Sequence, residues 1–299
     1  MEENTLTWLT HTVTYVTLFY ISFVIAKLFF KLKNRKINIE NELTIKDNVA
    51  FAVIATGYFI GTTIIFLGVL HGESHGLLTD VILILLYSIF GNFLLILSSI
   101  INEKIVFGKK FKFYREVIRD ENVGTGFIEA ANFIGSGLII FGAISGRNIN
   151  LFPEYGELGH YASDFLSLLF FWALGQIIIF VFLKVYKKIV SYDFIKEIQE
   201  DNNAIGIVYA SILISVAFLY SFASKGDINS WETTLEDILY HLGLAIILLP
   251  LSRLFVEKVI LPKSNLTDEI VNQEIPNKGA AILEAFAYIG SAIIISFCM

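Results

Sequence analysis

Apolar residues occur along this chain in runs of about twenty, and shorter polar segments separate the runs. A helix needs about 20 mainly apolar residues to cross the hydrocarbon core of a bilayer. The pattern predicts eight such spans, at residues 9–31, 49–70, 78–101, 124–145, 161–186, 204–223, 235–257 and 279–298. The composition agrees, with 55% hydrophobic residues, 17% charged residues and a mean hydropathy of +0.68. We therefore expect an all-α fold, a polytopic helical bundle with eight transmembrane helices.

The basic residues lie almost entirely on one side of the predicted spans. Twenty of the 22 lysine and arginine residues occur at the connections after the first, third, fifth and seventh spans, and Arg147 and Lys225 lie on the other side. The positive-inside rule then predicts that these connections lie in the cytoplasm and that both termini lie outside it. Residues 184–201 predict that the fifth span continues as an amphipathic helix into the cytoplasm.

A repeat divides the chain into two halves. The segments "GTGFIEAANFIGS" (124–136) and "GAAILEAFAYIGS" (279–291) match at a constant offset, which aligns Glu129 with Glu284. We predict two homologous four-span repeats, residues 1–147 and 148–299. An even number of spans gives both repeats the same orientation, so a pseudo-two-fold axis along the membrane normal should relate them.

A shorter period lies within each half. An Asn-x-small motif opens every even-numbered span, at Asn48, Asn122, Asn202 and Asn277. Thirteen residues later stands a small residue, at Gly61, Gly135, Ser215 and Gly290. Asparagine is a strong helix N-cap, and small residues let neighbouring helices approach closely, so we favour capping and packing roles. The alternative is that the converging helix N-termini bind an anion.

These motifs, together with the arginine of "RLFVEKVILP", resemble domain-of-unknown-function family 350, which includes uncharacterised bacterial inner-membrane proteins of the YjfL type. Typical members have one four-span domain, and this chain resembles two in tandem. The family has no established activity, so the resemblance implies at most an envelope-associated role. The first half departs from the pattern, because Ser99 lies near the position that corresponds to Arg253.

Two acidic side chains lie inside predicted spans. Glu129 and Glu284 are seven residues past their caps, which places them about 10 Å below the membrane surface. A charge at that depth is costly unless it is neutralised, paired or hydrated. We expect Arg253 to pair with Glu284, and Lys27 or Lys184 to pair with Glu129. These five residues are the candidate intramembrane charge sites.

Three functions remain open from the sequence, and a membrane enzyme is the least favoured of them because no catalytic constellation is visible. The first is a non-enzymatic accessory or scaffold protein of the bacterial envelope, whose partners are the lipid bilayer and, at the basic loops, a cytoplasmic protein or anionic lipid. The alternative is a proton- or ion-coupled channel or transporter that uses Glu129 and Glu284. No nucleophile elbow, zinc-protease or phosphate-loop motif, or Cys/His cluster occurs, so we expect no catalytic residues, metal or cofactor, and no nucleic-acid partner.

Overall fold

A computed structural model describes residues 2–72, 74, 76–105, 107–108, 111–228 and 230–298. The described residues are mainly helical and contain no strand. Within the described part of the chain, eight helices are long and apolar enough to cross a membrane, which confirms the eight predicted spans. These long helices are α1 (Glu2–Lys33), α2 (Val49–His71), α3 (Leu77–Ile105), α4 (Val123–Ile144), α5 (Gly156–Ile189), α7 (Asn203–Ser224), α8 (Trp231–Phe255) and α9 (Lys278–Cys298).

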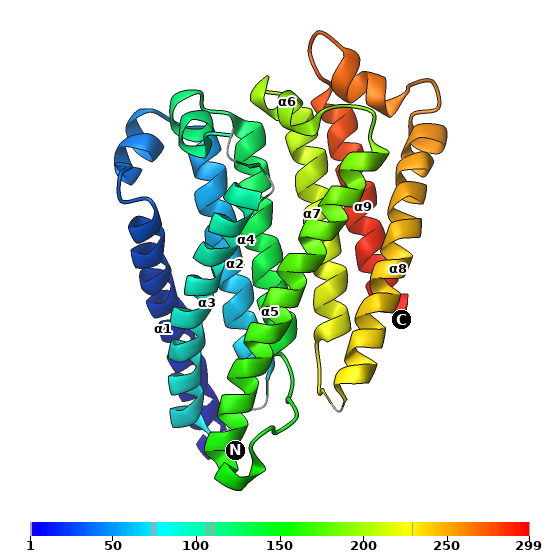
Figure 1. Ribbon diagram of the computed structural model, residues 1–299. Helices are drawn as coiled ribbons and strands as arrows, with labels where there is room; N and C mark the ends of the chain where they lie inside the picture. Colours follow the sequence, from blue (N-terminus) through cyan, green and yellow to red (C-terminus); the bar gives the residue numbers. More distant parts are fainter. Residues whose placement is uncertain are drawn as a thin grey trace.

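Short helical turns join the long helices, mainly at one end of the bundle (Figure 1). We refer to this as the loop-bearing end, and the basic connections lie here. The turns are η1 (Asn41–Ile45), η2 (Arg115–Arg119), α6 (Phe194–Gln199), η4 (Val256–Ile260) and η5 (Asp268–Asn272), with η3 (Pro153–Tyr155) at the opposite end.

The long helices form two layers (Figure 1). The helices α2, α4, α7 and α9 stand in a row in which each packs extensively on the next, whereas α1, α3, α5 and α8 lie alongside that row. The two middle helices are therefore the most enclosed, with 78% of the most apolar window of α4 and α7 buried, against 22% for α1 and α8. The pseudo-two-fold relation between the halves stays a prediction.

Small residues let the helices of the row approach one another closely. A Cβ atom added to Gly61 of α2 would lie 2.6 Å from the carbonyl oxygen of Phe133 in α4, and one added to Gly135 of α4 would lie 2.7 Å from Leu213 in α7. The third residue of the predicted series, Ser215, is fully buried. Such contacts stabilise helix pairs in membranes, where apolar burial alone drives no association.

Helix α9 is the last helix of the row, and no further helix of the row covers its outer face. At the offset of the repeat, Ala131 and Gly142 of α4 correspond to Phe286 and Phe297 of α9. These two phenylalanines are 67% and 73% exposed, and an added Cβ at Gly290 would meet only Phe286, at 3.9 Å. Large side chains thus cover the face that α4 uses for close packing, as expected for the last repeat of an array.

The fifth span does not continue into the loop as one helix, contrary to the sequence-based prediction. Helix α5 ends at Ile189, Val190 is extended, and α6 starts after its N-cap Asp193, whose side chain accepts from the backbone N–H groups of Ile195 and Lys196. An aspartate N-cap starts a new helix at this point. The break directs the segment that contains Tyr192 back over the bundle.

Candidate functional site

Glu129 is fully buried in the first half and pairs with Lys33 at the end of α1. The Lys33 Nζ atom lies 3.1 Å from a Glu129 carboxylate oxygen and 3.1 Å from a carboxylate oxygen of Glu103 in α3. The lysine side chain is 11% exposed, and its ammonium group also lies over the rings of Phe113 and Phe133. The single positive charge of Lys33 is thus shared between two carboxylates from different helices.

Hydrogen bonds from α3 complete the surroundings of Glu129. The Ser99 hydroxyl donates to one carboxylate oxygen, and the Asn102 side-chain amide donates to the other at 3.1 Å. Lys33 also donates to Ser99. Both oxygens of Glu129 therefore have partners, as a stable buried ion pair requires.

The predicted partners of Glu129 are corrected by this geometry. Lys27 is an exposed residue of α1, and Lys184 lies over the Phe180 ring, 4.5 Å from its centroid. The predicted first span ends at residue 31, which places Lys33 among the basic residues of the first connection. Because α1 continues to Lys33, this side chain reaches between α3 and α4.

The second half contains the expected pair of Arg253 and Glu284. The Arg253 Nη1 atom lies 3.2 Å from a carboxylate oxygen of the fully buried Glu284, and the Tyr288 hydroxyl donates to the same oxygen at 2.8 Å. The other carboxylate oxygen of Glu284 has no hydrogen-bond partner among the described residues. The guanidinium group also donates to Thr267 through Nη2, at 2.7 Å. This pair is less completely satisfied than the one at Glu129.

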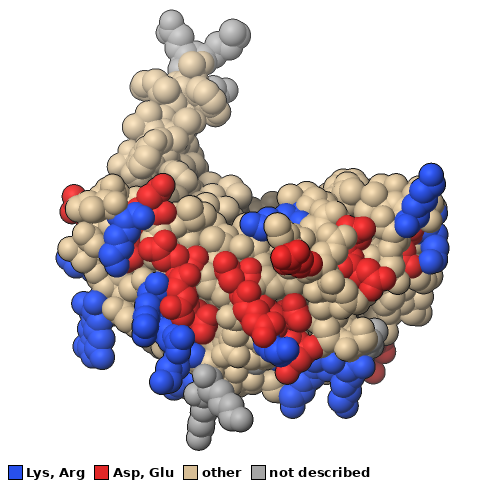
Figure 2. Space-filling model, turned by 90° about the horizontal axis from the view of Figure 1, so that it is seen from above, with Lys and Arg blue, Asp and Glu red and all other residues tan. Residues whose placement is uncertain are grey.

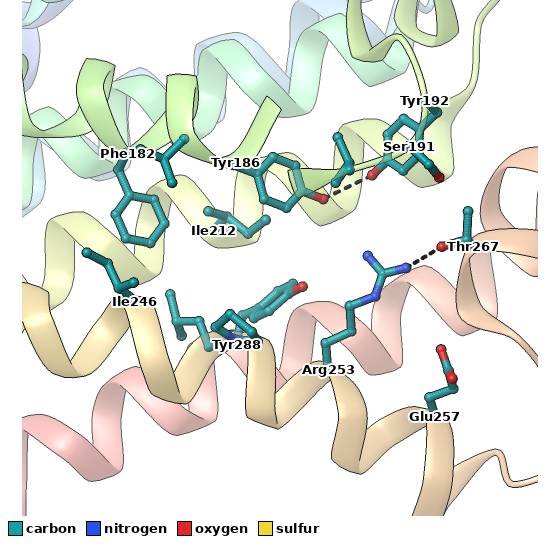
Figure 3. A pocket seen from close by; sticks show the side chains of 14 residues that line it. Phe182, Tyr186, Ser191, Tyr192, Ile212, Ile246, Arg253, Glu257, Thr267 and Tyr288 are labelled. Carbon is teal, nitrogen blue, oxygen red and sulfur yellow. Dashed lines mark hydrogen bonds between the residues drawn. The ribbon is translucent and has the colours of Figure 1, made fainter. Parts of the chain in front are cut away.

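A cavity of ≈ 270 Å³ adjoins this second pair and is lined by α5, α7, α8, α9 and the loop-bearing end (Figure 3). Figure 3 shows the polar ends of Arg253, Tyr192 and Thr267 gathered in one part of the cavity, whereas Phe182 and Ile246 line the other part. Arg253 is the one cationic residue that lines the cavity within the described chain. The cavity thus has a cationic end and an apolar end. We refer to it as the Arg253 cavity.

Hydroxyl groups line the polar end of the Arg253 cavity, and no sequence pattern pointed to them. The Tyr186 and Tyr192 hydroxyls lie 3.0 Å apart, and Tyr192 follows the break after α5. Burial raises the pKa of Tyr192 to about 12, so its phenol stays protonated and can donate a hydrogen bond at neutral pH. Glu257 also lines the cavity and pairs with Lys258 at 2.7 Å.

A second cavity, of ≈ 560 Å³, adjoins the first pair, and Lys33 and Glu103 line it. In each half, therefore, the cation of the buried pair lines a cavity, and the carboxylate is not among the lining residues. The cation comes from α1 in the first half and from α8 in the second, because Ser99 occupies the position that corresponds to Arg253.

The four predicted asparagines cap their helices. The side-chain oxygen of each accepts a backbone N–H three residues on, from Phe51, Thr125, Ile205 and Ala280. We call each pair of long helices that is joined at the loop-bearing end a hairpin. Three of the asparagines also donate to a backbone carbonyl in the connection of the next hairpin: Asn48 to Val117 at 2.9 Å, Asn122 to Ile198 at 2.5 Å and Asn202 to Ile270 at 2.8 Å. Asn277, at the end of the row, is exposed and donates to Glu269. The motif therefore caps each helix and joins successive hairpins.

The loop-bearing end carries charges of both signs. Figure 2 shows acidic side chains in a band across the middle of this face, with many of the basic side chains nearer its edge. Several exposed pairs lie here, including Arg115 with Asp120 at 3.0 Å and Lys196 with Glu200 at 3.6 Å. A partner of this face would therefore meet acidic groups as well as the basic groups that the sequence emphasised.

The helices and the buried ion pairs define a multi-pass membrane protein. The model of the family described as "Domain of Unknown Function (DUF350)" matches residues 4–144 and 160–299, so the chain belongs to this family and contains two copies of its domain. A "UPF0719 transmembrane protein" of Aquifex aeolicus (strain VF5) is 24% identical over 283 residues, which cover 93% of this chain and 96% of the relative. No solved structure matches the chain.

Proposed function

We propose that this protein couples the uptake of a proton to the binding and movement of a small anion, with Arg253 and Glu284 as the coupled pair. The observation that carries this proposal is the position of Arg253 between a fully buried carboxylate and a cavity. The loop-bearing end faces the cytoplasm in this proposal, because the basic connections lie there. The membrane is the bacterial inner membrane, and both termini lie outside the cytoplasm.

The coupling follows from charge compensation in a medium where an uncompensated charge is costly. When Glu284 is ionised, it neutralises Arg253, and the cavity has little attraction for an anion. When Glu284 takes up a proton, the positive charge of Arg253 loses its partner. An anion that enters the cavity then restores neutrality, so the proton and the anion bind together.

The groups around Arg253 suit this role. Thr267 orients the guanidinium group through one nitrogen, and Glu284 contacts another. The Tyr192 hydroxyl lies on the same cavity and supplies a neutral donor. Glu257 does not cancel this attraction, because Lys258 compensates its charge. An anion with a short apolar group would fit the apolar end beside Phe182 and Ile246.

Flux into proteoliposomes tests the proposal. The full chain is reconstituted, and acetate, chloride or phosphate is supplied outside while a trapped pH-sensitive dye reports proton entry. We expect one of these anions to drive proton entry above the level of protein-free liposomes. Arg253→Gln should abolish both fluxes, whereas Glu284→Gln should leave anion movement that no longer depends on pH. Lys258→Gln, which changes a neighbouring exposed cation, is the matched control.

Two results would count against the coupling. One is wild-type flux equal to that of protein-free liposomes for all three anions, in preparations whose folding is verified by size-exclusion chromatography. The other is Glu284→Gln protein with unchanged, pH-dependent flux. Either result would leave the buried pair as a purely structural contact between α8 and α9.

An accessory or scaffold role is the second candidate, and the charged loop-bearing face favours it (Figure 2). The cap asparagines hold the four hairpin connections in fixed register, which makes this face a rigid platform. Site-specific photocrosslinkers at exposed Lys196 and Arg119 should then capture one cytoplasmic protein reproducibly. A crosslinker at exposed Phe286, in the span of α9, is the control and should capture lipid instead.

A further inference from the structure

We propose that the cavity beside Lys33 holds an anionic phospholipid, with an acyl chain between α1 and α3 and the phosphate group on Arg35 and Lys36. We refer to this cavity as the Lys33 cavity. It lies in the first half, and the inference is independent of the proposed role of Arg253 and Glu284.

The lining of the Lys33 cavity suits an acyl chain. Phe29 and Leu32 of α1 line it together with Phe93, Ile96 and Ile100 of α3. Leu32 is 69% exposed and Phe93 is 48% exposed, and both belong to membrane-spanning helices. The cavity therefore has an apolar wall that continues onto the bundle surface, where hydrocarbon would surround it.

The cations stand where a lipid headgroup would lie. Lys33, Arg35 and Lys36 all line the cavity at the end of α1, in the turn that leads to the first connection. Lys33 is engaged by Glu103 and Glu129. Arg35 and Lys36 are exposed, and neither forms an ion pair with a residue that the structure describes. Their charges are thus available to a phosphate group at the membrane surface.

The dimensions favour a lipid over a free phosphate ion. From Phe93 to Glu103 the cavity follows α3 for ten residues, or about 15 Å along the helix. This length is about half of the roughly 30 Å hydrocarbon core, which is the depth of one leaflet. A free phosphate ion would use the cationic end and leave the apolar part empty. Basic pockets between helices at the cytoplasmic side are typical sites for anionic headgroups.

Lipid titration by native mass spectrometry tests the inference. Delipidated full-length protein is titrated with phosphatidylglycerol, with phosphatidylcholine, or with inorganic phosphate. We expect one tightly bound phosphatidylglycerol per chain, and the double variant R35Q/K36Q should bind it about thirtyfold more weakly. Ile96→Trp, which fills the apolar part, should also weaken phosphatidylglycerol binding. The variant K188Q/K263Q removes two exposed cations elsewhere on the same end and should bind it as tightly as wild type.

Three outcomes would overturn the inference. R35Q/K36Q and K188Q/K263Q could weaken binding equally, which would indicate a diffuse charge effect. Inorganic phosphate could compete fully while Ile96→Trp has no effect, which would identify a site for free phosphate. Phosphatidylcholine could bind as tightly as phosphatidylglycerol, which would remove the need for the cations.

Discussion

The partner of Glu129 provides the sharpest test of the buried ion pairs. We predict that Lys33→Met destabilises the protein strongly, because it leaves a fully buried carboxylate without its cation. Removing one member of a buried pair typically costs about 3–5 kcal/mol. For a chain of this length that corresponds to a fall of roughly 5–8 °C in the thermal midpoint. The neighbouring Glu103 would also lose its partner, which adds to the effect.

The reverse substitution should cost less. In Glu129→Met, Lys33 keeps Glu103 as a partner and still lines the Lys33 cavity. The double variant K33M/E129M removes both buried charges and replaces them with side chains of similar length, and Glu103, which is 30% exposed, keeps contact with solvent. Since apolar replacement of a whole buried pair is often neutral, we expect it to lie within about 1–2 kcal/mol of wild type.

The assay is thermal unfolding in one detergent, followed by tryptophan fluorescence or by loss of the monodisperse peak. Lys27→Met is the matched control, because it removes an exposed cation of the same helix and should change stability by less than about 0.5 kcal/mol. The reasoning is refuted if Lys27→Met costs as much as Lys33→Met, or if K33M/E129M is no more stable than Lys33→Met alone.

Two further pairs of variants test the row of helices by the same assay. Gly61→Ala should destabilise the protein by about 1–3 kcal/mol, because the added Cβ would lie 2.6 Å from a backbone oxygen of α4. Gly290→Ala should be neutral or stabilise the protein by up to about 1 kcal/mol through helix propensity. Equal losses of stability in the two variants would contradict the packing argument. Asn122→Ala should cost about 2–3 kcal/mol of stability, because it removes a helix cap and a buried hydrogen bond to Ile198 in the next hairpin. Asn277→Ala, at the exposed end of the row, should cost only about 1 kcal/mol for the cap. A larger loss of stability at Asn277 would show that the hydrogen bond to Ile198 adds nothing.

The fully buried Glu129 and Glu284 show how far a repeat in the sequence can predict a site. Their equal distance from the caps predicted two carboxylates at matching depth, and both are fully buried. The pairing of Arg253 with Glu284 could also be predicted from the sequence, because both residues lie about one or two turns inside neighbouring spans. The partner of Glu129 was not predicted, because Lys33 lies in the two residues by which α1 extends beyond the predicted span.

The cavities illustrate a second limit of the sequence. The Arg253 cavity depends on the break between α5 and α6, which brings Tyr192 back over the bundle. Hydropathy and periodicity describe each segment separately. They do not show where the chain turns back, and so they do not show which side chains share a space.

The sequence by itself determined the eight spans, the asparagine caps and the two copies of the domain. These features depend on residues close together in the chain: apolar runs long enough to cross a bilayer, and cap side chains that bond to the backbone three residues on. Only the tertiary structure decided that α2, α4, α7 and α9 form a row, that Lys33 neutralises Glu129, and that each buried pair adjoins a cavity. Those features depend on helix lengths and on side chains from distant segments, which no local pattern encodes.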